Sequence, residues 1–211
     1  MEISNHKLTG DKIKPYEQTS KTSGKYAPGN LDTVIIHYTA SPTFRSAYNT
    51  LLSPSVKASA HLLIDRDGTV LQMADFQTVT WQAGRSEYKG RSGFNKYSIG
   101  IEIVNAGPIK MQNGEFFDVY NIKYDAADVI EGKHRNRPMI SKYWHKYTDA
   151  QIETVEQICR LLVDEYGMKY ILGHEEISIG RKFDPGPAYP LDELRQKIFG
   201  NDLGHAGEKP K

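Results

Sequence analysis

The sequence predicts a single α/β domain in which a central mixed sheet is flanked by helices. Short β-branched apolar runs recur along the chain, and segments with helical periodicity separate them. The length of 211 residues is enough for one hydrophobic core. We expect an extended N-terminal arm over 1–30, a domain over 31–199 with an insertion at 106–147 after one of its strands, and a flexible tail over 200–211.

The first half of the domain is predicted to be mainly strands. Residues 1–30 are rich in Lys, Ser, Thr, Gly and Pro, so the ordered core is expected to start at "DTVIIHYTA". Its β-branched run predicts a buried strand that ends on His37, and "RSAYNTLL" predicts a short helix. "SAHLLIDRDGTVLQMA" predicts two strands joined by a turn at Asp65–Gly68, because glycine tolerates a positive φ.

The next strand is predicted at "YSIGIEIVNAG". Strand alternation places Ile99, Ile101 and Ile103 on one side, so Glu102 faces the other side. Residues 106–147 are polar and aromatic and lack a sustained period. We therefore expect an insertion over one face of the domain rather than a second core.

The clearest helix is "TDAQIETVEQICRLLVDEYG", with Thr148 as its N-cap and Gly167 as its stop. Its apolar stripe consists of Ile152, Val155, Ile158, Leu161 and Leu162. Cys159, the only cysteine, is expected to be a buried core thiol. "KYILGH" predicts a strand that ends on His174, "PLDELRQKIF" a final helix, and "NDLGHAGEKPK" a disordered tail.

The charge balance excludes several classes of partner. With 27 basic and 26 acidic residues the net charge is +1, which gives no global attraction for nucleic acid or an anionic membrane. The chain has no run of about 18 apolar residues, and its N-terminus has no apolar run after its charges. We therefore expect no membrane insertion, no signal peptide, and a monomer that is cytoplasmic as synthesised.

Three side chains are candidate metal ligands. His174 follows a strand, and Asp184 lies in a segment stiffened by two prolines. His37, at the end of another strand, is the best third ligand for a zinc ion with an open position, although a lone histidine at a strand end is more often structural. Lys182 and Asp184 are two residues apart, so in an extended segment they point to the same side.

Five motifs occur in a fixed order: "VIIHYTAS", "SAHLLIDRDGTVLQM", "WQAG", "NKYSIGIEI" and "GHEEISIGRKFDPGPAYP". Together they resemble the zinc-dependent N-acetylmuramoyl-L-alanine amidases, the superfamily that includes phage lysozyme-type amidases and peptidoglycan recognition proteins. The resemblance covers about residues 31–198. It implies a zinc amidase domain whose partner is peptidoglycan or a soluble muropeptide, and hydrolysis of the amide bond between the muramic acid lactyl group and L-alanine.

The resemblance also implies roles for the candidate residues. One Zn²⁺ would be held by His37, His174 and Asp184, and Lys182 would stabilise negative charge on the scissile carbonyl oxygen. The phage-lysozyme branch has a cysteine at the position of Asp184 and lacks a carboxylate at the position of Glu102. The sequence is therefore most similar to the anhydro-muropeptide amidase branch, in which this glutamate positions or deprotonates the attacking water.

Six further residues are candidate substrate contacts: Tyr38, His61, Trp81, Gln82, Asn95 and Arg181. The family often has Trp-His-Ala-Gly at the "WQAG" motif, and Gln82 cannot become cationic as histidine can, so we expect a change in substrate choice. Arg181 could pair with a carboxylate of the stem peptide. His61 has a second interpretation, as a structural residue near the metal.

Two other classes of function compete with a zinc amidase. A non-catalytic muropeptide-binding module would have lost some ligands, whereas all three are present here. A different zinc peptidase is disfavoured because the chain has no His-Glu-x-x-His pair. A recycling enzyme, a phage endolysin and a secreted effector that reaches the cell wall all remain open as biological settings.

Overall fold

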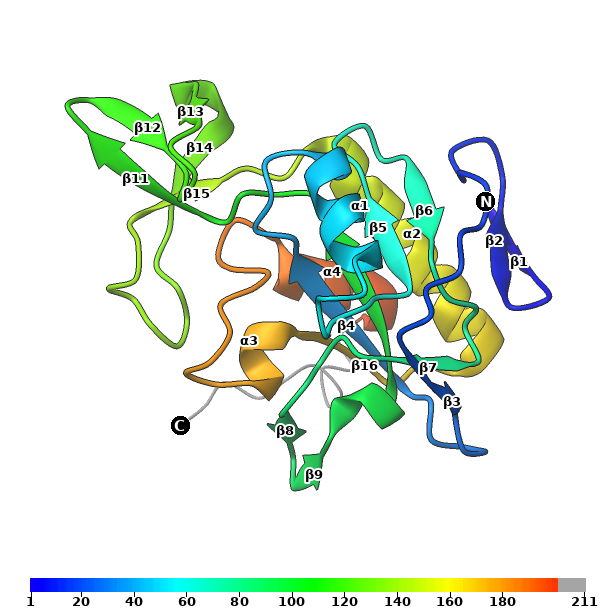
Figure 1. The fold of residues 1–211 in the computed structure, drawn as a ribbon. Helices are drawn as coiled ribbons and strands as arrows, with labels where there is room; N and C mark the ends of the chain where they lie inside the picture. Colours follow the sequence, from blue (N-terminus) through cyan, green and yellow to red (C-terminus); the bar gives the residue numbers. More distant parts are fainter. Residues whose placement is uncertain (201–211) are drawn as a thin grey trace.

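The computed structural model describes residues 1–200, and its centre is a five-stranded sheet with the order β16-β4-β10-β5-β6 (Figure 1). The strands are β4 (Thr33–Tyr38), β5 (Leu62–Ile64), β6 (Val70–Gln72), β10 (Ser98–Ile103) and β16 (Tyr170–Gly173). Neighbours from β16 to β5 are parallel, whereas β6 is antiparallel to β5. The predicted mixed sheet is confirmed. Beyond Gly200, the predicted tail lies outside the described residues.

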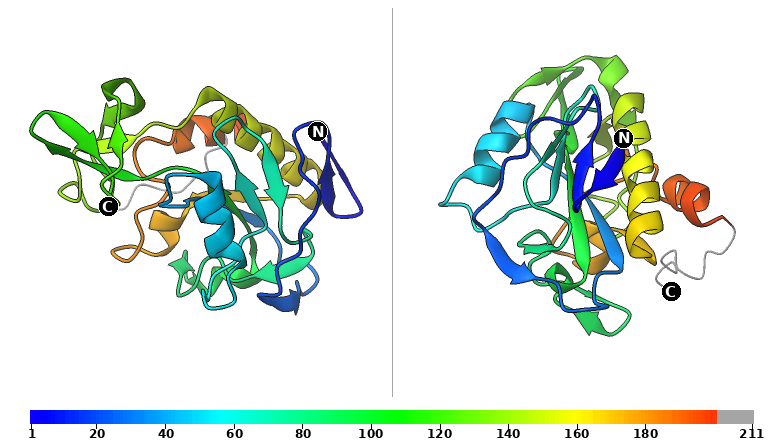
Figure 2. Two further views of the ribbon diagram at one scale, coloured as in Figure 1. Left: turned by 45° about the horizontal axis from the view of Figure 1, so that its top comes forward. Right: turned by 90° about the vertical axis from the view of Figure 1, so that its right-hand side faces the viewer.

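Helices cover both faces of this sheet. They are α1 (Phe44–Leu52), α2 (Asp149–Tyr166), the single turn α3 (His174–Ile177) and α4 (Leu191–Phe199). α1 lies on the face opposite α2 and α4 (Figure 2). Strand alternation explains the two cores, since Ile36 packs with Ile158 of α2 while Leu63 packs with Leu51 of α1. No helix in the described part of the chain is both long and apolar enough to cross a membrane.

The long helix α2 begins and ends where the sequence predicts. The Thr148 side chain accepts a hydrogen bond from the backbone N–H of Gln151, and Gln151 completes a capping box. Gly167 ends the helix in the left-handed conformation, with φ of 64°. Cys159 is fully buried in the main core. The predicted turn between β5 and β6 is also present, with Gly68 at a φ of 81°.

The ordered chain begins earlier than the sequence predicts. Residues in the predicted arm form a hairpin from β1 (Glu2–Ser4) and β2 (Lys7–Thr9), and β3 (Thr22–Lys25) pairs with β7 (Thr78–Thr80). Leu8 is only 5% exposed and belongs to the main core. Its backbone N–H donates to the Gln72 side chain at 2.7 Å. The apolar residues of the arm are too widely spaced to show a hydrophobic period, so the sequence did not predict these strands.

The insertion has regular structure that the sequence does not reveal. It forms an antiparallel sheet with the order β13-β12-β11-β15-β14, which projects to the side of the central sheet (Figure 1). Its strands are β11 (Pro108–Gln112), β12 (Glu115–Phe117), β13 (Lys123–Tyr124), β14 (Val129–Glu131) and β15 (Tyr143–His145). Strands of two to five residues are too short for an alternation signal.

The remaining elements are short. β8 (Glu87–Tyr88) and β9 (Arg91–Ser92) form a small hairpin, and two 3₁₀ turns span Phe94–Lys96 and Ala126–Asp128. The hairpin lies on the segment that links β7 to β10, beyond the end of the central sheet (Figure 1).

Candidate active site and metal centre

Two adjacent parallel strands bring the first two predicted ligands together. β16 pairs with β4 so that Gly173 lies beside Ile36, and the next residue in each segment is a histidine. The Nδ1 atoms of His37 and His174 are 2.9 Å apart. Both side chains are buried, at 1% and 3% exposure. The register of the sheet is therefore what makes the two imidazoles face each other.

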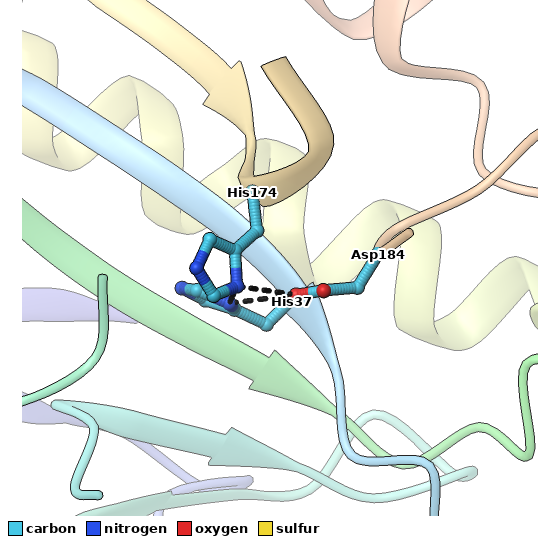
Figure 3. A group of neighbouring side chains, drawn as sticks. All are labelled: His37, His174 and Asp184. Carbon is cyan, nitrogen blue, oxygen red and sulfur yellow. Dashed lines mark hydrogen bonds and ion pairs between the residues drawn. The ribbon is translucent and has the colours of Figure 1, made fainter. Parts of the chain in front are cut away.

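Asp184 completes the group from the loop that follows α3. Its Oδ2 atom lies 2.8 Å from His37 Nδ1 and 3.0 Å from His174 Nδ1 (Figure 3). The backbone N–H of Glu175 donates to the Asp184 carbonyl at 2.8 Å, which ties the two ligand-bearing segments together. One donor atom from each of these three residues lies within 4.8 Å of the others, an arrangement that could hold a metal ion.

The hydrogen bonds at the far side of each imidazole fit a metal-binding role. His37 Nε2 lies 2.7 Å from the Oε1 atom of Gln82, whose amide nitrogen donates to Ser98 at 2.6 Å. His174 Nε2 lies 3.1 Å from the carbonyl of Ala83. Both acceptors require the proton on Nε2, so both Nδ1 lone pairs face the centre. With a metal bound, the two imidazoles and the carboxylate would be the donor set of a catalytic zinc site.

The carboxylate of this group is held in its charged form. Burial alone would raise the pKa of Asp184, but when His174 and His37 carry a proton on Nδ1 their charge and hydrogen bonds outweigh burial and lower the pKa well below its usual value. Asp184 is therefore available as an anionic ligand.

Glu102 lies beside His37 on the neighbouring strand. The two residues are register partners in the parallel pair of β4 and β10, and they face away from α2, as the alternation of β10 predicts. Glu102 Oε2 is enclosed and has no hydrogen-bond partner among the described residues. Burial raises the pKa of Glu102 to about 7, with His37 and Lys182 opposing the rise and Asp184 adding to it. A carboxyl group with this pKa can exchange a proton near neutral pH.

A cleft of about 490 Å³ opens onto these groups. The three candidate ligands, Glu102 and Lys182 line one part of it, together with Tyr38, Gln82 and Arg181. Burial, followed by the nearby carboxylates, raises the pKa of the Tyr38 hydroxyl, which therefore stays protonated. The guanidinium of Arg181 donates to the carbonyls of Ala83 and Arg85, at 2.8 and 2.6 Å.

Three of the predicted substrate contacts do not line this cleft: His61, Trp81 and Asn95. His61 is fully buried, and its ring bonds the Thr78 carbonyl at 2.8 Å and the Gly100 amide at 3.0 Å. Burial lowers the pKa of His61 to about 4, so it stays neutral. The structural interpretation of His61 holds, and its assignment as a substrate contact was wrong.

Trp81 and Asn95 bond neighbouring segments of the protein instead. The Trp81 indole donates to Ser23 of the N-terminal arm at 2.7 Å. The Asn95 side chain accepts from the Ala83 amide at 2.7 Å, next to the residue that faces His37. Motif position alone could not distinguish a side chain in the cleft from one that holds the wall of the cleft in place.

Gln82 has a role that the sequence did not predict. It lies in the cleft wall, as a substrate contact would, but its amide is committed to His37 and Ser98. Gly100 makes room for this arrangement, since a Cβ there would lie 2.5 Å from Gln82 Cγ. Another part of the cleft wall was missed entirely. It is formed by small and apolar residues of α1 and 56–59, including Thr50, Val56 and Ser59, and their residue types carry no chemical signal.

A buried carboxylate beside two histidines and an aspartate, at the ends of parallel strands in an α/β sheet, is the arrangement of a metal-dependent hydrolase. The sequence family described as N-acetylmuramoyl-L-alanine amidase matches residues 27–187, so the chain belongs to that family. This confirms the resemblance that the five motifs carry.

Individual relatives agree with the family. The chain is 32% identical over 142 residues to 1,6-anhydro-N-acetylmuramyl-L-alanine amidase AmpD of Escherichia coli K12, covering 66% of this chain and 58% of AmpD. It is 27% identical over 194 residues to N-acetylmuramoyl-L-alanine amidase AmiD of the same organism, covering 88% of this chain and 59% of AmiD. The chain thus spans just under three fifths of the length of these relatives.

A solved structure shares the fold. The complex of Escherichia coli AmiD with the substrate anhydro-N-acetylmuramic acid-L-Ala-D-gamma-Glu-L-Lys superposes with a TM-score of 0.61 at 26% identity. The match covers 81% of this chain and 58% of AmiD. The central sheet and its flanking helices are therefore the family architecture.

Proposed function

We propose that this protein is a zinc-dependent amidase that hydrolyses the bond between the lactyl group of muramic acid and L-alanine in peptidoglycan or soluble muropeptides. The observation that carries the proposal is the convergence of His37, His174 and Asp184 beside the buried carboxyl of Glu102 in one cleft. Family membership supports the proposal. The names of the relatives also support it, because AmpD is named as a 1,6-anhydro-N-acetylmuramyl-L-alanine amidase and AmiD as an N-acetylmuramoyl-L-alanine amidase.

The metal supplies one part of the chemistry. Zn²⁺ held by His37, His174 and Asp184 would polarise the amide carbonyl and lower the pKa of water. The hydrogen bonds that the imidazole Nε2–H groups donate to Gln82 Oε1 and the Ala83 carbonyl keep the two rings in the tautomer that this ligation needs.

The side chains of the cleft supply the remaining steps. Glu102, with its raised pKa, accepts a proton from the attacking water and passes it to the leaving amine of L-alanine. Lys182 offsets the negative charge that develops on the carbonyl oxygen. The neutral Tyr38 hydroxyl, which lines the same cleft, donates a hydrogen bond to the substrate.

The lining of the cleft suggests which parts of the substrate it takes. Arg181 and Lys182 would attract carboxylates of a stem peptide. Thr50, Val56 and Ser59 are uncharged and suit a sugar with hydroxyl and acetamido groups. The scissile amide would lie beside Glu102 and the candidate ligands, which line the same cleft.

The test measures metal and product separately. Purified protein is analysed for zinc by mass spectrometry, and its action on anhydro-muropeptides and intact sacculi is followed by chromatography of the released peptides. One zinc per chain and free L-alanyl peptides are expected from wild type, with loss of activity after chelation. Zinc and substrate binding without product would indicate the binding module instead.

Two further expectations concern the oligomeric state of the protein and its location in the cell. We expect a monomer in light scattering and a cytoplasmic location in cell fractionation. Preference for soluble anhydro-muropeptides over sacculi would indicate a recycling enzyme, and the reverse preference an enzyme that acts on the cell wall.

A further inference from the structure

One histidine of the insertion lies directly behind the candidate metal centre. His134, in the loop between β14 and β15, is 1% exposed. Its Nε2 atom lies 3.2 Å from the carbonyl of Phe183 and 2.6 Å from Oε2 of Glu175. Phe183 precedes Asp184, and Glu175 follows His174. One ring nitrogen therefore contacts the chain neighbours of two candidate ligands at once.

The His134 ring is fixed on every side. Its Nδ1 accepts hydrogen bonds from the backbone N–H groups of Asn136 and Arg137, both at 3.1 Å, so the ring proton must lie on Nε2. Trp144 of β15 stacks on the ring at 5.8 Å and 26°, and Phe183 contacts it edge-on at 5.7 Å. The insertion thus presents a pre-oriented N–H donor to the loop of Asp184.

Neighbouring residues of the insertion hold the same segment. The Asn136 side chain donates to the carbonyl of Glu175 at 2.8 Å, and Arg135 Nε lies 2.9 Å from the Glu175 carboxylate. Glu175 is 2% exposed, and a carboxylate that is buried in this way needs partners such as these to offset the loss of solvation. We call His134, Arg135 and Asn136 the brace.

The brace acts on a segment with little structure of its own. Between α3 and α4 the chain has no regular element, and a backbone hydrogen bond from the Glu175 N–H to the Asp184 carbonyl ties it to the residue after His174. A metal ligand must be held within a few tenths of an ångström, and residues that orient ligands are worth roughly 10–100-fold in metal affinity. Contacts at Phe183 and Glu175 lie where they can set that geometry.

We propose that the brace positions Asp184 relative to His174, and that His134 is its central positioning residue. The proposal rests on the metal site of the proposed function. It assigns the insertion a part in building the centre, although no brace residue lines the cleft. A purely structural role for His134 would change stability but leave the metal geometry of the folded protein intact.

The experiment compares metal binding by wild type, His134→Leu, His134→Gln and Asn136→Ala. Zinc affinity is measured by competition with a chelator, and the visible spectrum of the Co²⁺-loaded protein reports the ligand geometry. His134→Leu is expected to lower zinc affinity roughly 10–100-fold and to alter the Co²⁺ spectrum. His134→Gln keeps an N–H donor and is expected to recover most of both. Asn136→Ala, at a half-buried position, is expected to lose several-fold in affinity.

His145→Leu is the matched control. His145 is a second buried histidine of the insertion, 5% exposed, but its Nδ1 accepts from the Ala106 amide, far in sequence from the ligand-bearing loop. It is expected to cost stability without changing zinc affinity or the spectrum.

Each outcome separates the two proposals. If wild type binds neither Zn²⁺ nor Co²⁺, the proposed function is wrong. If wild type binds metal and the folded His134 variants bind it equally, with an unchanged spectrum, the brace is only structural. If His134→Leu does not fold, Asn136→Ala decides the matter, and wild-type affinity and spectrum there would overturn the proposal.

Discussion

The two halves of the candidate site are held by different kinds of structure. His37 and Glu102 are paired on neighbouring strands of a buried sheet, where backbone hydrogen bonds fix their spacing. In the other half, the register of β16 places His174, whereas Asp184 ends a segment that has only one helical turn and is held by contacts from the insertion and α4. The strand half can be displaced only by disrupting the sheet, whereas the loop half depends on particular side chains.

The largest effect is expected in the strand half. Glu102→Gln removes the proton acceptor but keeps size and polarity, so kcat should fall about 10²–10⁴-fold, or about 3–5 kcal/mol. Because β10 is unchanged, zinc content and circular dichroism should match wild type. Steady-state kinetics on an anhydro-muropeptide measures the change. Full activity in a zinc-loaded Glu102→Gln protein would show that another group accepts the proton.

The next effect concerns how the strand half orients its ligand. Gln82→Leu removes the acceptor of the His37 Nε2–H group and leaves a buried donor unpaired. Zinc affinity is expected to fall roughly 10–100-fold. Gln82→Glu, which keeps an acceptor oxygen, is the control and should bind zinc more tightly than Gln82→Leu. Equal affinity in wild type and Gln82→Leu would mean that the sheet alone orients His37.

The same contrast explains what the sequence could predict. The run before His37 and the alternation around Glu102 depend on local patterns, so β4, β10, the main helix and the face of Glu102 were predicted correctly. His174 and Asp184 were named through motif resemblance, and the structure brings them together with His37. The brace depends on contacts about 40 residues apart in the chain, such as His134 with Glu175, which no local pattern contains.

The ionisation of Glu102 gives a smaller effect of known sign. Its pKa is raised to about 7 mainly by burial, and the protonated form cannot accept a proton. Activity should therefore fall about tenfold per pH unit on the acidic side of the profile. The fall should begin at or below pH 7, because a bound cation favours the ionised form of Glu102 and lowers its pKa. The measurement is kcat from pH 4 to 8, with zinc content checked at each point. A flat profile with zinc retained would exclude Glu102 as the base.

The smallest effect tests whether the loop half depends on its contacts or on its own sequence. Ile179 lies between His174 and Asp184 but is 67% exposed, so Ile179→Ser should change the free energy of unfolding by less than about 0.5 kcal/mol. Zinc affinity should stay within twofold of wild type. Ile177, two residues earlier and 1% exposed, packs in the core with Leu172, so Ile177→Ala should cost about 2–5 kcal/mol.

Denaturant unfolding and chelator competition on these two variants distinguish the explanations. If contacts hold the loop, an exposed side chain within it contributes nothing, however near the ligands it lies in sequence. Loss of zinc affinity in Ile179→Ser comparable to that of the brace variants would mean that the conformation of the loop itself sets the geometry. The difference between the two halves of the site would then lie partly in backbone preference, and the brace would not be the only support of the loop.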